Sequence, residues 1–393
     1  MPRKLTRRSL IQGMAGAVAS GMLASRFAAF GQVEEHGSQL RGWERGDIGR
    51  MTANFKRQFN VPGLSIAISR NGQFVFDHGF GIADRKDSIQ ASNTSQFRIA
   101  ALSKPITSVA IFTFIEKEKL HLNDKVFGPS GILGTKYYKP PAKPYITDVT
   151  VDNLLTHTAG GWPADSTDPM FQHNGWDHDK LVSWTLENSP LTYPPGQHWA
   201  YSNFGYCVLG RVVEQVSGQT YSDYVQASVL APCGISTMSI AQNAMKHRAS
   251  DEVIYYGQYG EDPYKINVTR MDSDDGWIAT PSNLVQFLDH LGSPNFPSLL
   301  KPESIRIMTT PSRVPPGPPG GRYARGWLVP GDGSGLWWHN GSLPGSTTIM
   351  ARTGRGLCWA ALANTRTQPS DEIDASLNKL MWDIVRSVPE WGA

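Results

Sequence analysis

The stretch FRIAALSKPITSVAIF, residues 97–112, decides the fold of this chain. It has small residues at positions 100, 101 and 103, Pro105 stands where a helix tolerates the loss of one backbone N–H, and apolar residues follow at helical spacing. Lys104 lies just inside this predicted helix, where an ammonium without a partner is costly to bury. The residue one turn earlier on the same helix face is Ala101, which has no reactive group.

Composition and charge bound the class of protein. The 393 residues are 40% apolar and 18% charged, which allows a large core and excludes disordered and collagen-like chains. The formal net charge is +3, but five cationic residues lie within residues 1–31, and without them it falls to −2. We therefore expect no nucleic-acid partner. The three cysteines are scattered and odd in number, so we expect buried thiols rather than disulfides or a metal site.

Residues 1–31 are typical of a Tat-type signal peptide. Arg7 and Arg8 form a twin-arginine pair, a short run rich in alanine and glycine follows, and small residues stand near Ala28. The plainer alternative is a basic, disordered N-terminus. The first interpretation predicts an exported protein, periplasmic or extracellular. No segment approaches the ~20 apolar residues of a membrane span, so no integral membrane segment is expected.

The order of predicted elements indicates a sheet assembled from both ends of the chain. Residues 45–59 carry an apolar helical stripe, and residues 61–81 read as a hairpin turning at Asn71-Gly72. Strand patterns return only after residue 325 and precede a final amphipathic helix. We predict an antiparallel sheet flanked by helices in an α/β (α+β) domain of residues 40–105 plus 310–390, with a mainly helical domain of residues 106–309 inserted.

Three short elements carry the chemistry: Ala-Leu-Ser-Lys at 101–104, Tyr-Ser-Asn at 201–203 and His-Asn-Gly-Ser at 339–342. Their order resembles the penicillin-recognising serine hydrolases, which include class C β-lactamases, DD-peptidases, D-aminopeptidases and related esterases, and whose pattern is S-x-x-K, Y-x-N and K-T-G or H-x-G. The phrases LLTHTAGG, YPPGQHWAYSN and DGWIATPSNLVQFL match as well. The resemblance extends from about residue 45 to 385 and implies a β-lactamase-like fold.

The resemblance implies roles for the first two elements. Position 101 would hold the nucleophile, with Lys104 in reach to ease its deprotonation. Tyr201 would be a general base whose pKa is lowered by Lys104, and Asn203 would bind the acyl side chain of the substrate and also cap the next helix.

The third element would complete the site. His339 and Gly341 would lie on an edge strand, and the backbone N–H of Ser342 would share an oxyanion hole with that of residue 101. Trp277 and Trp327 would flank the cleft. A histidine at 339 is only partly charged near neutrality, which favours esterase or peptidase chemistry over penicillin hydrolysis. No metal or organic cofactor is implied.

The departure from the family pattern is Ala101, because the nucleophile of the family aligns there. Ser103 would point away from the face shared by residues 101 and 104. Two literal S-x-x-K strings, 298–301 and 376–379, follow the Tyr-x-Asn element and so fall in the wrong order. We therefore expect turnover to be lost.

Two explanations for Ala101 remain open. The first is that a serine at 101 was replaced by alanine in the laboratory, which the otherwise intact site favours. The second is a natural pseudoenzyme, which the leader still present at the N-terminus favours. The first predicts a serine hydrolase scaffold for a small ester, amide or peptide. The alternative is an exported binding module for peptidoglycan fragments or a protein partner. A third possibility, metal-dependent chemistry at His173, Asp177, His178 and Asp179, is less favoured than a solvated loop, and His157 is expected to order its own loop.

Overall fold

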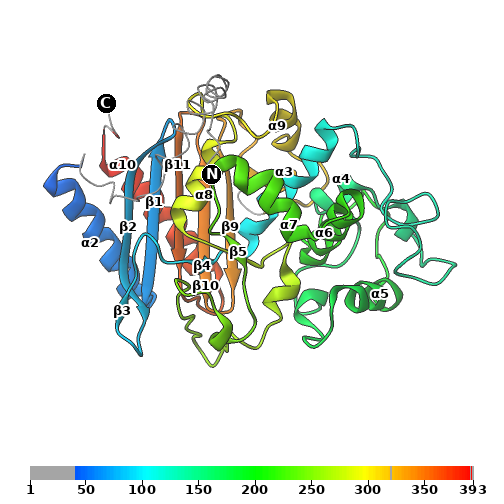
Figure 1. Cartoon of the computed structure of the whole chain (residues 1–393), viewed down its shortest axis with the longest axis horizontal. Helices are drawn as coiled ribbons and strands as arrows, with labels where there is room; N and C mark the ends of the chain where they lie inside the picture. Colours follow the sequence, from blue (N-terminus) through cyan, green and yellow to red (C-terminus); the bar gives the residue numbers. More distant parts are fainter. Residues whose placement is uncertain (1–39, 319–320, 390, 392–393) are drawn as a thin grey trace, which may run out of the picture. The chain divides into compact units, whose positions relative to one another are not determined.

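The computed structural model describes residues 40–318, 321–389 and 391 (Figure 1). The predicted signal peptide lies outside the described residues. The helices are α2 (Gly42–Gln58), α3 (Ser103–Glu116), α4 (Val151–Leu155), α5 (His178–Asn188), α6 (Asn203–Ser217), α7 (Tyr221–Val225), α8 (Pro281–Asp289), α9 (Pro302–Met308) and α10 (Asp371–Ser387). The strands are β1 (Gly63–Arg70), β2 (Gln73–Asp84), β3 (Ile89–Gln90), β4 (Phe97–Arg98), β5 (Ser239–Ile240), β6 (Trp277–Ala279), β7 (Arg322–Tyr323), β8 (Leu328–Val329), β9 (Trp337–Leu343), β10 (Ser346–Arg352) and β11 (Leu357–Ala363).

The main sheet joins the two ends of the described chain. Its strand order is β3-β2-β1-β11-β10-β9-β8-β7, and the strands pair antiparallel. The β1–β2 turn contains Asn71 and Gly72, both with positive φ (51° and 82°), which matches the predicted hairpin turn. The predicted antiparallel sheet flanked by helices is confirmed.

Alternating side chains of the central strands build two cores. In β11, Trp359 and Ala361 pack with α2 and α10, whereas Ala360 and Leu362 join the core beneath α3, α6 and α8. The alternation follows from the two-residue period of a strand. Figure 1 shows α2 and α10 on one side of the sheet and the helices α3 to α7 on the other. A sheet buried on both faces holds the site strand β9 in a fixed register.

A second, three-stranded sheet was not anticipated from the sequence. Its order is β4-β6-β5, and Phe97 pairs with Ala279 while Ser239 pairs with Ile278. Each strand is only two or three residues long, too short to show an alternating pattern. Residues 106–309 therefore include strands as well as helices. All described residues belong to one compact unit. The division of this unit into two domains stays a prediction.

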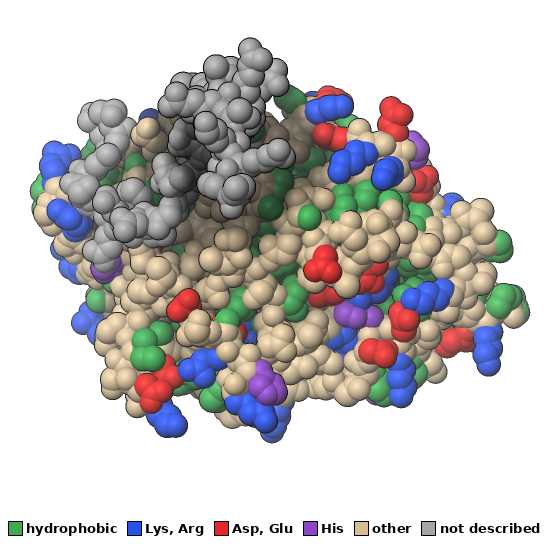
Figure 2. All heavy atoms as spheres, in the orientation of Figure 1, with side chains coloured by type: hydrophobic (Ala, Val, Ile, Leu, Met, Phe, Trp, Pro, Cys, Tyr) green, Lys and Arg blue, Asp and Glu red, His purple; other side chains and the backbone are tan. Residues whose placement is uncertain are grey.

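The surface of the described chain shows mixed charge. On the face in Figure 2, Lys and Arg side chains lie among Asp and Glu side chains. This agrees with the low net charge of the sequence after its first 31 residues. Within the described residues, no helix combines the length and apolar character needed to cross a membrane.

Candidate active site

Position 101 stands at a strained turn before α3. The helix does not begin at the predicted entry: β4 runs into a 3₁₀ turn at Ala100–Leu102, and α3 begins at Ser103. Ala100 has φ +52°, a left-handed conformation that is unfavourable for alanine. The Ser103 hydroxyl donates to the Ala100 carbonyl (2.8 Å), which fixes this turn. Ser103 is fully buried and committed to the turn, whereas Ala101 keeps 9% of its surface exposed.

Strand β9 brings the third sequence element against position 101. A Cβ added to Gly341 would lie 2.7 Å from the Ile99 carbonyl oxygen and 2.9 Å from the Ala101 nitrogen. The Thr348 hydroxyl on β10 donates to the same Ile99 carbonyl (2.8 Å). Glycine is thus required at 341 because the two backbones touch. The Ser342 side chain points to the opposite strand face from Gly341, so only its backbone N–H can serve the predicted oxyanion hole.

His339 is a neutral, fully engaged imidazole. Its Nδ1 contacts the Asn340 carbonyl (2.6 Å), and its Nε2 pairs with the Tyr323 hydroxyl (3.1 Å). With Nδ1 donating, Nε2 accepts from Tyr323. Burial, and then the Lys104 ammonium, lower the pKa of His339 to about 3. The expected partial charge at neutral pH is therefore wrong, because the sequence pattern did not reveal how deeply this residue is buried.

Lys104 lies at the centre of the site without exposed surface. Its Nζ donates to Asp275 Oδ1 (3.1 Å) and to the Asp274 carbonyl (3.2 Å), and it lies 5.1 Å from the centre of the Tyr201 ring. Burial on its own would lower the pKa of the Lys104 ammonium, but the Asp275 carboxylate and Tyr201 outweigh burial and raise it. Lys104 is therefore a cation at neutral pH.

Tyr201 keeps its proton. Its ring lies 6.3 Å from that of His339 and 5.1 Å from Lys104 Nζ, which places the first two motif residues beside the third. Burial raises the pKa of the Tyr201 phenol to about 12 even though Lys104 opposes this effect. The expected lowering of the Tyr201 pKa is wrong, because burial and the nearby Asp275 outweigh the attraction of the ammonium.

Asn203 is oriented by a hydrogen bond to Asp168. Its Nδ2 donates to Asp168 Oδ2 (2.7 Å), and burial raises the pKa of Asp168 to about 6. The cap of α6 is Ser202, whose Oγ accepts from the Gly205 N–H (3.0 Å). The predicted N-cap was therefore displaced by one residue. His157 accepts from the Ser202 N–H (3.1 Å) and lies 4.2 Å from the Tyr201 ring, so it orders the loop before α6 that carries Tyr201.

The two tryptophans predicted to flank the cleft have no exposed surface. Trp277 donates its indole N–H to the Tyr221 hydroxyl (3.2 Å), and Trp327 packs edge-on against Trp337. The role of aromatic cleft wall does not agree with this burial. Both are core residues that support α3 and β9.

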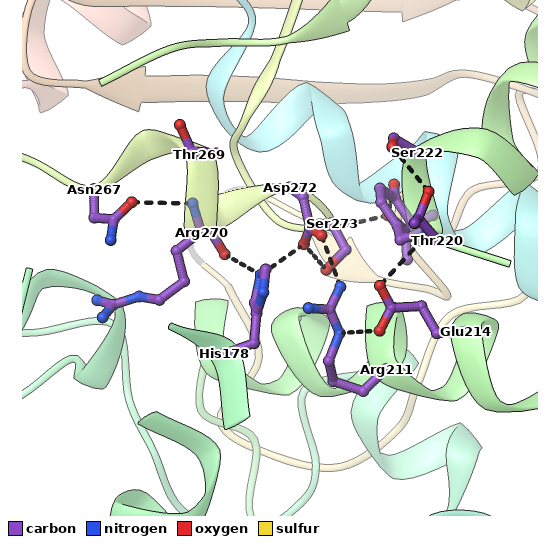
Figure 3. A network of polar contacts seen from close by, with 12 residues as sticks. His178, Arg211, Glu214, Thr220, Ser222, Asn267, Thr269, Arg270, Asp272 and Ser273 are labelled. Atoms are coloured by element: carbon purple, nitrogen blue, oxygen red, sulfur yellow. Dashed lines mark hydrogen bonds and ion pairs between the residues drawn. The ribbon is translucent and has the colours of Figure 1, made fainter. Parts of the chain in front are cut away.

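Of the four residues considered as metal ligands, His178 belongs to a polar network (Figure 3), whereas His173, Asp177 and Asp179 are exposed, as expected of a solvated segment. His178 Nε2 contacts the Arg270 carbonyl (2.8 Å) and Asp272 Oδ1 (3.3 Å), while Asp177 caps α5. Asp272 also pairs with Arg211 (2.7 Å). Among the residues that the structure describes, no group of three or more His, Cys, Asp or Glu side chains is arranged to hold a metal ion.

Two site residues were missed by the sequence interpretation. Tyr323 holds His339, and Asp275 holds Lys104. The run Asp272-Ser273-Asp274-Asp275 directly before an apolar strand was a usable signal, because acidic residues next to a buried segment need partners. Tyr323 carries no such local signal.

Comparisons with known proteins bear on the family and the fold of this chain. The family model described as Beta-lactamase matches residues 48–380. Protein flp of Staphylococcus aureus (strain MRSA252) is 26% identical over 328 residues, which cover 81% of this chain and 62% of that protein. Penicillin-binding protein 4* of Bacillus subtilis (strain 168) is 28% identical over 329 residues, covering 77% and 67%. The chain thus spans less than two thirds of the length of protein flp.

A solved structure extends the likeness to the fold. The D-amino acid amidase from Ochrobactrum anthropi SV3, complexed with L-phenylalanine amide, superimposes with a TM-score of 0.71 at 20% identity. The match covers 88% of this chain and 99% of the amidase chain. At this identity the likeness concerns the fold alone.

Proposed function

The chain belongs to the β-lactamase family, and on that premise we propose that it is a serine-hydrolase scaffold that binds an ester or amide but does not turn it over. One observation carries the proposal. Ala101 lies against Gly341 and one helical turn before Lys104, whose ammonium lies beside Tyr201, and the methyl group of Ala101 cannot attack a carbonyl. Substrate binding does not require the missing hydroxyl.

The parent chemistry would be acyl transfer. A serine Oγ at 101 would bond to the carbonyl carbon, the bond to the leaving group would break, and water would later release the acyl group. The backbone N–H groups of residues 101 and 342 would hold the oxyanion, and Asn203 would contact the acyl side chain. In the parent enzyme, proton transfer would fall to Tyr201 and Lys104.

The neutral state of His339 supports an ester or amide substrate over a penicillin. Both of its ring nitrogens are engaged, and its pKa is lowered to about 3, so it offers no positive charge to a substrate carboxylate. An esterase- or amidase-like substrate without a recognised carboxylate fits this site best.

A second candidate is a natural pseudoenzyme that acts as an exported binding module for peptidoglycan fragments or a protein partner. The ion pair between Lys104 and Asp275 favours it, because a lysine held by a carboxylate is stable without a nucleophile beside it. Export itself rests on the twin-arginine leader. Removal of that leader in a periplasmic or culture fraction, measured by mass spectrometry, tests it.

The direct test compares the chain with its Ala101→Ser variant. We expect a fluorophosphonate to label the variant at residue 101 and to leave the unsubstituted chain, with Ala101, unlabelled. We also expect the variant to hydrolyse at least one of three probes: p-nitrophenyl esters of several chain lengths, a D-amino acid amide or a chromogenic cephalosporin. The probe that reacts fastest names the substrate class. A folded Ala101→Ser chain that stays unlabelled after prolonged incubation contradicts the proposal that this chain is a serine-hydrolase scaffold.

A further inference from the structure

The ammonium of Lys104 is held by the segment that precedes β6. A lysine side chain carries three N–H donors. One goes to Asp275 Oδ1 (3.1 Å) and one to the Asp274 carbonyl (3.2 Å). A serine placed at 101 would therefore meet a lysine that is already paired with a carboxylate.

Asp275 is held rigidly in this position. It lies 3% exposed in the tight turn between the 3₁₀ helix Val268–Met271 and β6, and its backbone N–H donates to the Met271 carbonyl (2.9 Å). The next residue, Gly276, approaches that carbonyl so closely that an added Cβ would lie 2.8 Å from its oxygen. On the α3 side, Thr107 donates its hydroxyl to the Ser273 carbonyl (2.6 Å). The turn is thus fixed to the helix that carries Lys104.

We propose that Asp275 is a positioning residue that keeps Lys104 an ammonium and so slows acyl transfer by a serine at 101, independently of the loss of the nucleophile at that position. The inference rests on the proposed function. Acylation requires the serine proton to pass to a base while the Oγ–carbon bond forms. An ammonium cannot accept that proton, and the Tyr201 phenol holds its own.

The other titratable groups around Lys104 do not replace Asp275. They are Asp168, Asp274, Tyr201, Tyr206, His157 and His339. Both carboxyl oxygens of Asp274 are buried without a hydrogen-bond partner, and burial raises its pKa well above the ordinary value, so it is a weaker partner for the ammonium than Asp275. Burial lowers the pKa of both histidines, which leaves them neutral. Asp168 is engaged with Asn203. Removing the Asp275 charge thus removes the carboxylate in contact with Lys104.

The experiment uses the full chain with Asp275→Asn, alone and combined with Ala101→Ser. Asparagine keeps the shape and one acceptor oxygen but loses the charge. Asp289→Asn, another buried aspartate, with a bond from Ser69 instead of Lys104, is the matched control. Asp275→Glu tests whether a longer carboxylate still keeps Lys104 an ammonium and acyl transfer slow.

Two readouts separate positioning from mere structural support. The first is the titration of Lys104 by NMR of 13Cε-labelled lysine, which needs no catalytic activity. We expect no deprotonation up to about pH 11 in the parent and in Asp289→Asn, and a lower midpoint in Asp275→Asn. The second is the rate of fluorophosphonate labelling against pH. We expect Ala101→Ser/Asp275→Asn to react about 100-fold faster than Ala101→Ser, with its rising limb at lower pH, and Ala101→Ser/Asp275→Glu to stay slow.

Each outcome has a defined meaning. A Lys104 midpoint below about pH 9 in the parent overturns the proposal without any substitution at 275. So does an unchanged titration in folded Asp275→Asn, or an Ala101→Ser chain that labels as fast as the double variant. If the Lys104 titration shifts in Asp275→Asn while Ala101→Ser and Ala101→Ser/Asp275→Asn both remain unlabelled, the role of Asp275 is supported and the proposed serine-hydrolase scaffold is contradicted.

Discussion

Gly341→Ala tests whether β9 rests directly on the backbone of position 101. The added Cβ would lie 2.4 Å from Thr348 Oγ1, 2.7 Å from the Ile99 carbonyl oxygen and 2.9 Å from the Ala101 nitrogen. Two of these atoms belong to backbone and cannot rotate away. Thr348 can rotate only by giving up its bond to the buried Ile99 carbonyl.

The magnitude combines overpacking with that lost hydrogen bond. Overpacking a well-filled core costs about 1–3 kcal/mol, and a buried carbonyl without a partner costs about 1–3 kcal/mol. Part of each is avoided if β9 shifts, so we expect the free energy of unfolding to fall by about 2–4 kcal/mol. The same shift would move Gly341 and His339 relative to Ala101.

The assay is urea unfolding followed by tryptophan fluorescence. Gly49→Ala is the control, because an added Cβ would meet no atom within 4 Å, and alanine at this position within α2 should stabilise the helix by up to about 1 kcal/mol. In the Ala101→Ser background, Gly341→Ala should also slow fluorophosphonate labelling, and Gly49→Ala should not. A Gly341→Ala chain as stable as the parent, with unchanged labelling, would refute the close approach of the two backbones.

Two further predictions concern charge. Burial raises the pKa of Asp289 to about 6, so its contribution to stability is full below pH ~4 and is lost as the pH rises through about 6. Asp289→Asn should remove this loss, and from pH 4 to 7 its free energy of unfolding should gain up to about 3 kcal/mol relative to the parent; parallel pH profiles of the two chains would contradict this. Arg270 donates to the carbonyls of Met170, Gln172, His173 and Trp176, so Arg270→Ala should lower stability by about 3 kcal/mol and speed proteolysis within residues 169–176. Arg306→Ala, which removes an exposed arginine paired with Glu303, should leave the cleavage pattern unchanged, and equal cleavage of the two variants would count against the Arg270 network.

Local patterns were sufficient for the sheet and for the motif residues. Asn71-Gly72 specifies a hairpin through two positive φ angles that few other residues adopt, and the short runs of apolar and β-branched residues in β10 and β11 indicate strands without tertiary information. The order of the three short elements predicted that Lys104, Tyr201 and His339 would meet, and the structure brings them together.

The charge states of these residues could not be predicted in the same way. The pKa of Tyr201 or His339 depends on burial and on partners such as Asp275 that lie far away in the sequence. The same holds for Tyr323, whose position follows from the pairing of β7 with β8. A motif fixes which side chains meet, whereas the surrounding core determines their protonation.

The pairing of β1 with β11 also governs when the site can form during synthesis. Leu64 pairs with Ala363 and Arg70 with Leu357. The β1–β2 hairpin is therefore synthesised early, but the edge of β1 that pairs with β11 stays uncovered until almost the whole chain has been made. Contacts between residues so far apart slow folding, and until they form the open edge of β1 can pair wrongly with another chain. Gly341 reaches Ala101 only as part of this late sheet. Shielding of the β1 edge by chaperones should therefore matter more for the yield of folded protein than the stability of any single helix.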